Sequence, residues 1–160
     1  RDVERSRGLG DVYKRQVLVR QDPFEIGQFV REIRSGDYDA FFRRLQSFFA
    51  DTPYEVIAGQ KPERDTELHY RNVLFIVFKL VGLYTQVEYH TSQGRIDLVL
   101  KTDRYIYVME FKLNGTAEEA LRQIEERQYA LPFASDPRQV FKIGVNFSSV
   151  TRNIERWLVE

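Results

Sequence analysis

Three residues with side chains suited to metal and phosphate chemistry stand on two neighbouring apolar segments. Asp97 lies in the first segment, residues 94–101, while Glu110 and Lys112 close the second, residues 105–112. Apolar segments of this length joined by a short polar connection are typical of a β-hairpin. Because strand side chains alternate between faces, Glu110 and Lys112 are predicted to point the same way.

The second segment is apolar on both faces over most of its length, which predicts a central strand covered on both sides. Charged groups at the end of such a strand cost free energy unless a partner compensates them. A divalent metal held by Asp97 and Glu110, with Lys112 beside it, would provide that compensation. Magnesium suits such a site because it binds one or two carboxylates and keeps several waters.

An ordinary structural role explains the same residues equally well when they are taken alone. Glu110 and Lys112 are also consistent with a simple ion pair where the strand meets solvent. Asp97 is consistent with an acid hydrogen-bonded to Arg95 or to the backbone. Short motifs of this kind occur by chance, so the rest of the chain has to decide between the two interpretations.

The composition limits the classes of protein that the chain can form. Its 160 residues, 42% of them hydrophobic, are enough for one domain with a buried core. The 24 basic and 24 acidic residues cancel, so any contact with nucleic acid has to come from a local patch. The chain has no cysteine, which excludes disulfides and thiolate metal sites.

The same patterns bear on localisation. The longest apolar run, residues 73–78, is far too short to span a bilayer. No secretory signal pattern opens the sequence. Together with the absence of cysteine, this leads us to expect a cytoplasmic protein with no membrane partner.

The first half of the chain is predicted to be helical. Residues 1–16 show no apolar periodicity and are expected to be a non-native or disordered tail. Helical apolar spacing then runs from Pro23 to Ser35 and from Asp37 to just before Pro53. A third, largely buried helix is expected over residues 65–81.

The second half alternates between strands and helices. Strands are predicted over residues 84–90, over the two segments of the hairpin and over residues 140–147. A helix that begins with a Thr116–Glu119 capping box is expected to run to about Ala130. A terminal helix is predicted over residues 151–158, anchored by Trp157. The strand–helix–strand step requires a parallel pairing, so the sheet is expected to be mixed.

This order of elements, with Asp97, Glu110 and Lys112 where they fall, resembles the PD-(D/E)XK nuclease superfamily, which has the restriction-endonuclease-like fold. Further matching segments are Gly94-Arg95-Ile96-Asp97, Glu110-Phe111-Lys112, 117–124, Tyr129-Ala130, 143–147 and 152–157. Ile96 replaces the proline of the superfamily name. In detail the chain looks like a bacterial subfamily in which this domain follows an AAA-ATPase-like module.

The resemblance implies an α/β fold with an αβββαβ core preceded by two helices. It also implies that residues 17–52 form a helical connection from an ATPase-like module that this chain lacks, and that residues 53–160 form the nuclease-like domain. The full-length chain would then contain both modules. The resemblance says nothing of the oligomeric state.

The resemblance further implies a role for each site residue. Asp97 and Glu110 would bind Mg²⁺ or Mn²⁺ with the backbone carbonyl of Phe111. Lys112 would position the attacking water and stabilise charge on the phosphate. Two further residues complete the expected site, Glu67 as an accessory acid and Gln123 as a helix glutamine near the acids. Tyr129 is not expected to join them, because six positions along one helix put it on a different face from Gln123.

Three possibilities remain open at this level. The first is a metal-dependent phosphodiesterase that acts on DNA. The second is a catalytically idle module of the same fold that binds nucleic acid or docks a partner of an ATPase. The presence of Asp97, Glu110 and Lys112 together favours the enzyme. A purely structural domain with a surface ion-pair cluster is a third possibility.

Overall fold

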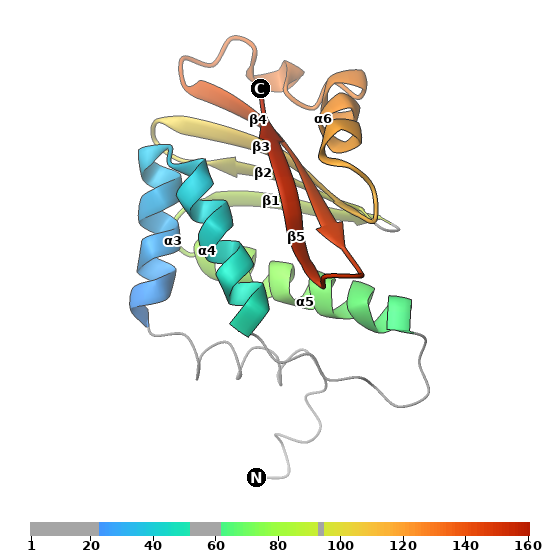
Figure 1. Ribbon diagram of the computed structural model, residues 1–160. Coiled ribbons are helices and arrows are strands. Elements are labelled where there is room, and N and C mark those ends of the chain that lie inside the picture. The colour runs from blue at the N-terminus through green and yellow to red at the C-terminus, as the bar shows by residue number, and fades with distance from the viewer. Residues whose placement is uncertain (1–22, 52–61, 93–94) are drawn as a thin grey trace, which may run out of the picture.

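A computed structural model of the chain describes residues 23–51, 62–92 and 95–160. They form a mixed five-stranded sheet with helices on both faces (Figure 1). The predicted tail, residues 1–16, lies outside the described residues.

Five strands follow one another across the sheet in chain order. Their bounds are β1 Gln86–Ser92, β2 Arg95–Lys101, β3 Tyr105–Leu113, β4 Gln139–Ser148 and β5 Asn153–Val159. Neighbouring strands are antiparallel except for β3 and β4, which are parallel and joined through a helix. The predicted hairpin, crossover and mixed sheet are therefore confirmed.

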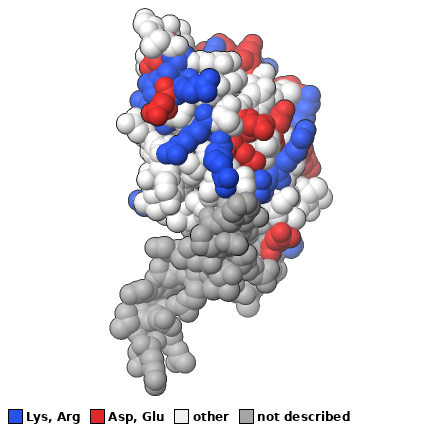
Figure 2. Space-filling model, turned by 90° about the vertical axis from the view of Figure 1, so that its left-hand side faces the viewer, with Lys and Arg blue, Asp and Glu red and all other residues white. Residues whose placement is uncertain are grey.

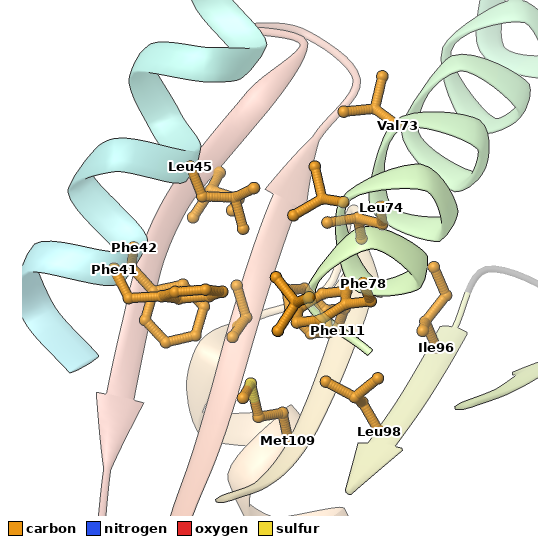
Figure 3. Close-up of a cluster of buried hydrophobic side chains, with 14 of the residues drawn as sticks. Phe41, Phe42, Leu45, Val73, Leu74, Phe78, Ile96, Leu98, Met109 and Phe111 are labelled. Carbon is orange, nitrogen blue, oxygen red and sulfur yellow. The ribbon is translucent and has the colours of Figure 1, made fainter. Parts of the chain in front are cut away.

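Three helices pack on one face of the sheet, α3 (Pro23–Ser35), α4 (Tyr38–Asp51) and α5 (Pro62–Val81) (Figure 1). The second begins where the sequence predicts, because Asp37 Oδ1 accepts a hydrogen bond from the Ala40 amide at 3.2 Å. All three helices share one apolar core with the sheet. The rings of Phe42 and Phe78 lie 6.2 Å and 5.9 Å from that of Phe111, at the centre of this core (Figure 3).

A single α-helix, α6 (Ala117–Glu126), covers the opposite face among the described residues (Figure 1). Its Ile124 packs with Ile106 and Val108 of β3 in a second, smaller apolar cluster. The predicted capping box is half formed, because Thr116 Oγ1 accepts a hydrogen bond from the Glu119 amide at 3.0 Å. Because α6 covers the second face of the sheet, β3 is a central strand buried on both sides, as predicted.

The prediction of a terminal helix over residues 151–158 is wrong, because residues 153–158 belong to β5 and residues 151–152 to the turn before it. Ile154 and Trp157 are three positions apart, a spacing typical of a helix face. In the structure a β-bulge leaves Glu155 as an extra residue, so Ile154 and Trp157 both face the same core. Trp157 is an anchor as expected, since it stacks on Phe42 at 5.3 Å and donates a hydrogen bond to Asp39 at 2.8 Å.

The prediction that the α6 helix extends to about Ala130 is also wrong, since the helix ends at Glu126. Gln128 adopts the left-handed conformation with φ of 55°. The amide of Tyr129 then donates to the carbonyl of Ile124 at 3.2 Å, closing the helix end. A short 3₁₀ turn, η1 (Leu131–Phe133), follows.

The tightest contact in the fold lies between α6 and β4. A Cβ atom added to Gly144 would lie 2.3 Å from the carbonyl oxygen of Ala117 and 2.5 Å from the amide nitrogen of Leu121. Only glycine therefore allows the helix backbone to come this close to the strand.

We expect Gly144→Ala to lower the free energy of unfolding by about 1–3 kcal/mol, because the backbone of α6 has to move away from the strand. Urea denaturation measures this change. Gly27→Ala in α3 is the matched control, since its Cβ would meet nothing closer than Arg31 Nη2 at 3.7 Å. The control should be neutral or stabilising by about 0.4–1 kcal/mol. Equal stability of the Gly144→Ala variant and the wild type would show that the contact is looser than described.

Candidate active site

The predicted acids lie side by side on the α6 face of the sheet. Asp97 of β2 pairs directly with Glu110 of β3, which in turn pairs with Gly144 of β4. On the other side of Asp97, the exposed His90 of β1 completes the row. Residues directly opposite one another in neighbouring strands point to the same face, so this row presents both carboxylates beneath α6.

A second row lies two residues further towards the end of the sheet, where Arg95 of β2 pairs with Lys112 of β3. Arg95 Nε is 3.5 Å from Asp97 Oδ1 and 3.7 Å from Glu110 Oε1, so one guanidinium serves both acids. The side chain of Glu110 is fully buried, while that of Asp97 is 18% exposed. The site therefore places a buried acid, Glu110, beside a partly exposed one, Asp97.

The environment of Glu110 opposes its ionisation. Burial raises the pKa of Glu110 to about 8, and both a hydrogen bond with Asp97 and the charge of Asp97 add to the effect. Arg95 and Lys112 act in the opposite direction without cancelling the rise. In the absence of a metal, the carboxyl group of Glu110 is consequently protonated near neutral pH.

Lys112 and Gln123 meet above Glu110. With its amide nitrogen turned towards Glu110, Gln123 donates to the two carboxylate oxygens at 3.3 Å and 2.8 Å and accepts from Lys112 Nζ at 2.9 Å. Lys112 Nζ also lies 3.7 Å from Glu119 of α6. Among the described residues, its ion pair is thus with Glu119 and not with Glu110, contrary to the simple ion-pair interpretation of the strand.

Tyr129 joins the site, although the sequence analysis set it aside. Its hydroxyl donates to Asp97 Oδ2 at 3.2 Å and accepts from Arg127 Nη1 at 3.0 Å. The expectation failed because it assumed a continuous helix. The left-handed Gln128 reverses the chain after α6 and turns Tyr129 back onto the sheet. Helix ends with a left-handed residue usually have glycine or asparagine at that position, so Gln128 does not mark the end in the sequence. Pro132, four residues later, is the nearest signal that the helix stops.

Glu67 lies in α5 and forms an ion pair with Arg71, whose Nη2 is 3.3 Å from Glu67 Oε1. Glu67 and Asp97 both act on the buried hydroxyl of Tyr70, where their charges add to the effect of burial in raising its pKa. Within the described ranges, however, no three acidic, histidine or cysteine side chains gather into a metal cluster. A role for Glu67 in the site remains a prediction.

The residues present fit a divalent cation held by two carboxylates. With both acids ionised, Asp97 Oδ1 is buried and has no hydrogen-bond donor among the described residues. A positive ion at this oxygen would satisfy it and would favour the ionised form of Glu110. Two carboxylates supplemented by waters are a typical ligand set for Mg²⁺. The carbonyl of Phe111, which lies between Glu110 and Lys112, remains a predicted third ligand.

One side of the molecule carries positive and negative side chains close together. Figure 2 shows the side on which α3 lies in Figure 1, where Lys and Arg lie beside Asp and Glu. Near the acids, the positive charge comes from Arg95, Lys112 and Arg127.

Comparison with known proteins identifies the family of the chain. A family model described as the PD-(D/E)XK nuclease superfamily matches residues 65–157, which is more than half of the chain. The chain belongs to this superfamily, and its mixed sheet is consistent with the restriction-endonuclease-like fold. Nucleases of the superfamily generally use divalent metals.

A relative is found in Azotobacter chroococcum mcd 1, where it is described as an uncharacterized protein in the vnfD 5' region. The two sequences are 28% identical over 138 residues, which cover 85% of this chain and 27% of the relative. The chain thus spans about a quarter of that relative's length. No described helix is both long and apolar enough to cross a membrane.

The raised pKa of Glu110 predicts how the stability of the metal-free protein depends on pH. Between pH 4.5, the ordinary pKa of a glutamate, and about pH 8, the native state binds more protons than the unfolded state, so stability falls as pH rises. The slope for one proton is at most about 1.4 kcal/mol per pH unit. Urea denaturation in EDTA at several pH values measures it.

Glu110→Gln should remove this part of the slope, because the amide does not titrate. Glu126→Gln, which changes an exposed acid of α6, should keep the wild-type slope. A Glu110→Gln variant with the wild-type pH dependence would show that Glu110 is not the group that titrates.

Proposed function

We propose that the chain is a Mg²⁺- or Mn²⁺-dependent phosphodiesterase that hydrolyses DNA. The observation that supports this most strongly is the arrangement of three residues on one face of the sheet. Asp97 and Glu110 are direct cross-strand neighbours, and Lys112 lies on the same face of β3 as Glu110. The superfamily supports nuclease chemistry in general, while the metal and the DNA substrate are our inference.

The two acids would hold the metal, with the carbonyl of Phe111 as a further ligand. A bound metal would lower the pKa of a coordinated water and polarise the phosphate. Gln123 fixes the Glu110 carboxylate through two hydrogen bonds, and Tyr129 fixes that of Asp97. Both acids are therefore held in orientation before any ligand arrives.

Lys112 supplies the positive charge that two carboxylates lack. Hydrolysis of a phosphodiester adds charge to the non-bridging oxygens, and a cation held nearby stabilises that charge. Gln123 accepts a hydrogen bond from Lys112 Nζ, which keeps the ammonium group close to Glu110. The contact of Lys112 Nζ with the half-buried Glu119 is longer, at 3.7 Å, and a substrate phosphate would compete with it.

The full-length protein is proposed to contain an AAA-ATPase-like module before this domain, with α3 and α4 as the connection. The relative from Azotobacter chroococcum, which is longer than this chain, is compatible with an additional module. Within the described structure, Phe29, Phe41 and Phe42 place these two helices in the same core as the sheet. Any force that the module applies to α3 and α4 would therefore reach β3 through packed side chains.

Lys112→Ala is expected to lower DNA cleavage on the order of 10²–10³-fold, the effect of removing one preorganised charge from a phosphate site. Gel assays with single- and double-stranded DNA, with Mg²⁺ or Mn²⁺, measure this loss. Metal affinity should survive, because Lys112 is not a ligand.

Lys142→Ala is the matched control, since Lys142 lies on β4 and pairs with Glu125 at 2.6 Å, outside the site. The control should cleave as the wild type does. The assay is best run on the full-length protein as well. If the full-length wild type leaves DNA intact with either metal, the phosphodiesterase assignment fails and an idle nuclease-fold module takes its place.

A further inference from the structure

A second cation reaches the acid pair from the end of α6. Arg127 is exposed and follows the last residue of the helix, just before the left-handed Gln128. Its Nη1 donates to the Tyr129 hydroxyl at 3.0 Å, and that hydroxyl donates to Asp97 at 3.2 Å. The helix end therefore places a guanidinium one side chain away from a proposed metal ligand.

The three cations of the site are used differently. Arg95 lies between Asp97 and Glu110, and its side chain is only 19% exposed. Its guanidinium is therefore paired with the two acids. Lys112 is held by Gln123 and Glu119 beneath α6. Arg127 contacts a neutral phenol and, among the described residues, has no carboxylate within ion-pair distance.

Arg127 nevertheless interacts electrostatically with Asp97 and Glu110. Its hydrogen bond with Tyr129 raises the pKa of the guanidinium, and the charges of Glu110 and Asp97 add to this. A guanidinium offers five N–H donors in a planar fork that matches a phosphate, and only one of them is used here. Arg127 thus combines solvent access, unused donors and proximity to the acid pair.

We propose that Arg127 binds a second phosphate of the substrate backbone, a neighbour of the phosphate that reacts beside Lys112. This inference rests on the proposed function and deepens it. Lys112 approaches the acid pair from β3, whereas Arg127 approaches through Tyr129 at Asp97, so the two cations serve different positions. A substrate that engages both carries at least two successive phosphates, which is the chemistry of a nucleic-acid strand and not of a small phosphodiester.

The test measures binding of a fluorescent DNA oligonucleotide by anisotropy, with Ca²⁺ in place of the catalytic metal and over a series of salt concentrations. The full chain is compared with Arg127→Ala, Arg127→Lys and Arg122→Ala. Arg122 is the matched control, because it is exposed on the same helix and makes no hydrogen bond or ion pair with the described residues.

Arg127→Ala should weaken DNA binding and reduce the salt dependence by about one phosphate contact, while Arg122→Ala changes neither. Arg127→Lys should keep the salt dependence and lose part of the affinity, since lysine lacks the fork. The affinity for Mn²⁺, measured by calorimetry without DNA, should stay within about twofold of the wild type in all three variants.

Two results would overturn the proposal while leaving the proposed function in place. One is an Arg127→Ala variant that binds DNA with the wild-type affinity and salt dependence. The other is an Arg127→Ala variant that loses Mn²⁺ affinity in parallel with DNA affinity, since Arg127 would then act only through Tyr129 on Asp97. A wild type that neither binds nor cleaves DNA would instead remove the proposed function, and this inference with it.

Discussion

The crowding of two carboxylates at one point of the sheet is the constraint on which the site depends. Cross-strand pairing puts Asp97 opposite Glu110, and burial leaves Glu110 without solvent to stabilise its charge. A single arginine between them is not enough, because the pKa of Glu110 still rises to about 8. With both acids ionised, the site is therefore unfavourable. A further positive ion would stabilise it, and this is why the pair is suited to binding a metal.

The surrounding fold holds this unfavourable arrangement in place from both sides of β3. Below the strand, Phe111 lies in the aromatic core between Phe42 and Phe78, so Glu110 and Lys112 have to project the other way (Figure 3). Above it, α6 approaches β4 at Gly144 and brings Gln123 over the acids. The core thus sets the direction of the site residues, and the close helix contact sets their partners.

Much of this could be predicted because it follows from alternation along one strand. The hairpin, the shared face of Glu110 and Lys112 and the parallel crossover all come from the spacing of apolar residues between 94 and 147. The failures share a physical cause, which is a local break in periodicity. The bulge at Glu155 gives the apolar residues of β5 the spacing of a helix. The left-handed Gln128 ends α6 and reverses the chain at a position that no glycine or asparagine marks in the sequence. Tyr129 and Arg127 enter the site only through that reversal.

The most direct test of the account is the number of protons released when Mn²⁺ binds. Calorimetric titration at pH 7 in two buffers with different ionisation enthalpies gives this number. Because Glu110 is protonated in the metal-free protein and must ionise to act as a ligand, we expect release of close to one proton per metal. Glu110→Gln should abolish the release. Metal binding with no proton release, or no binding at all, would contradict the claim that the Asp97–Glu110 pair is a metal site.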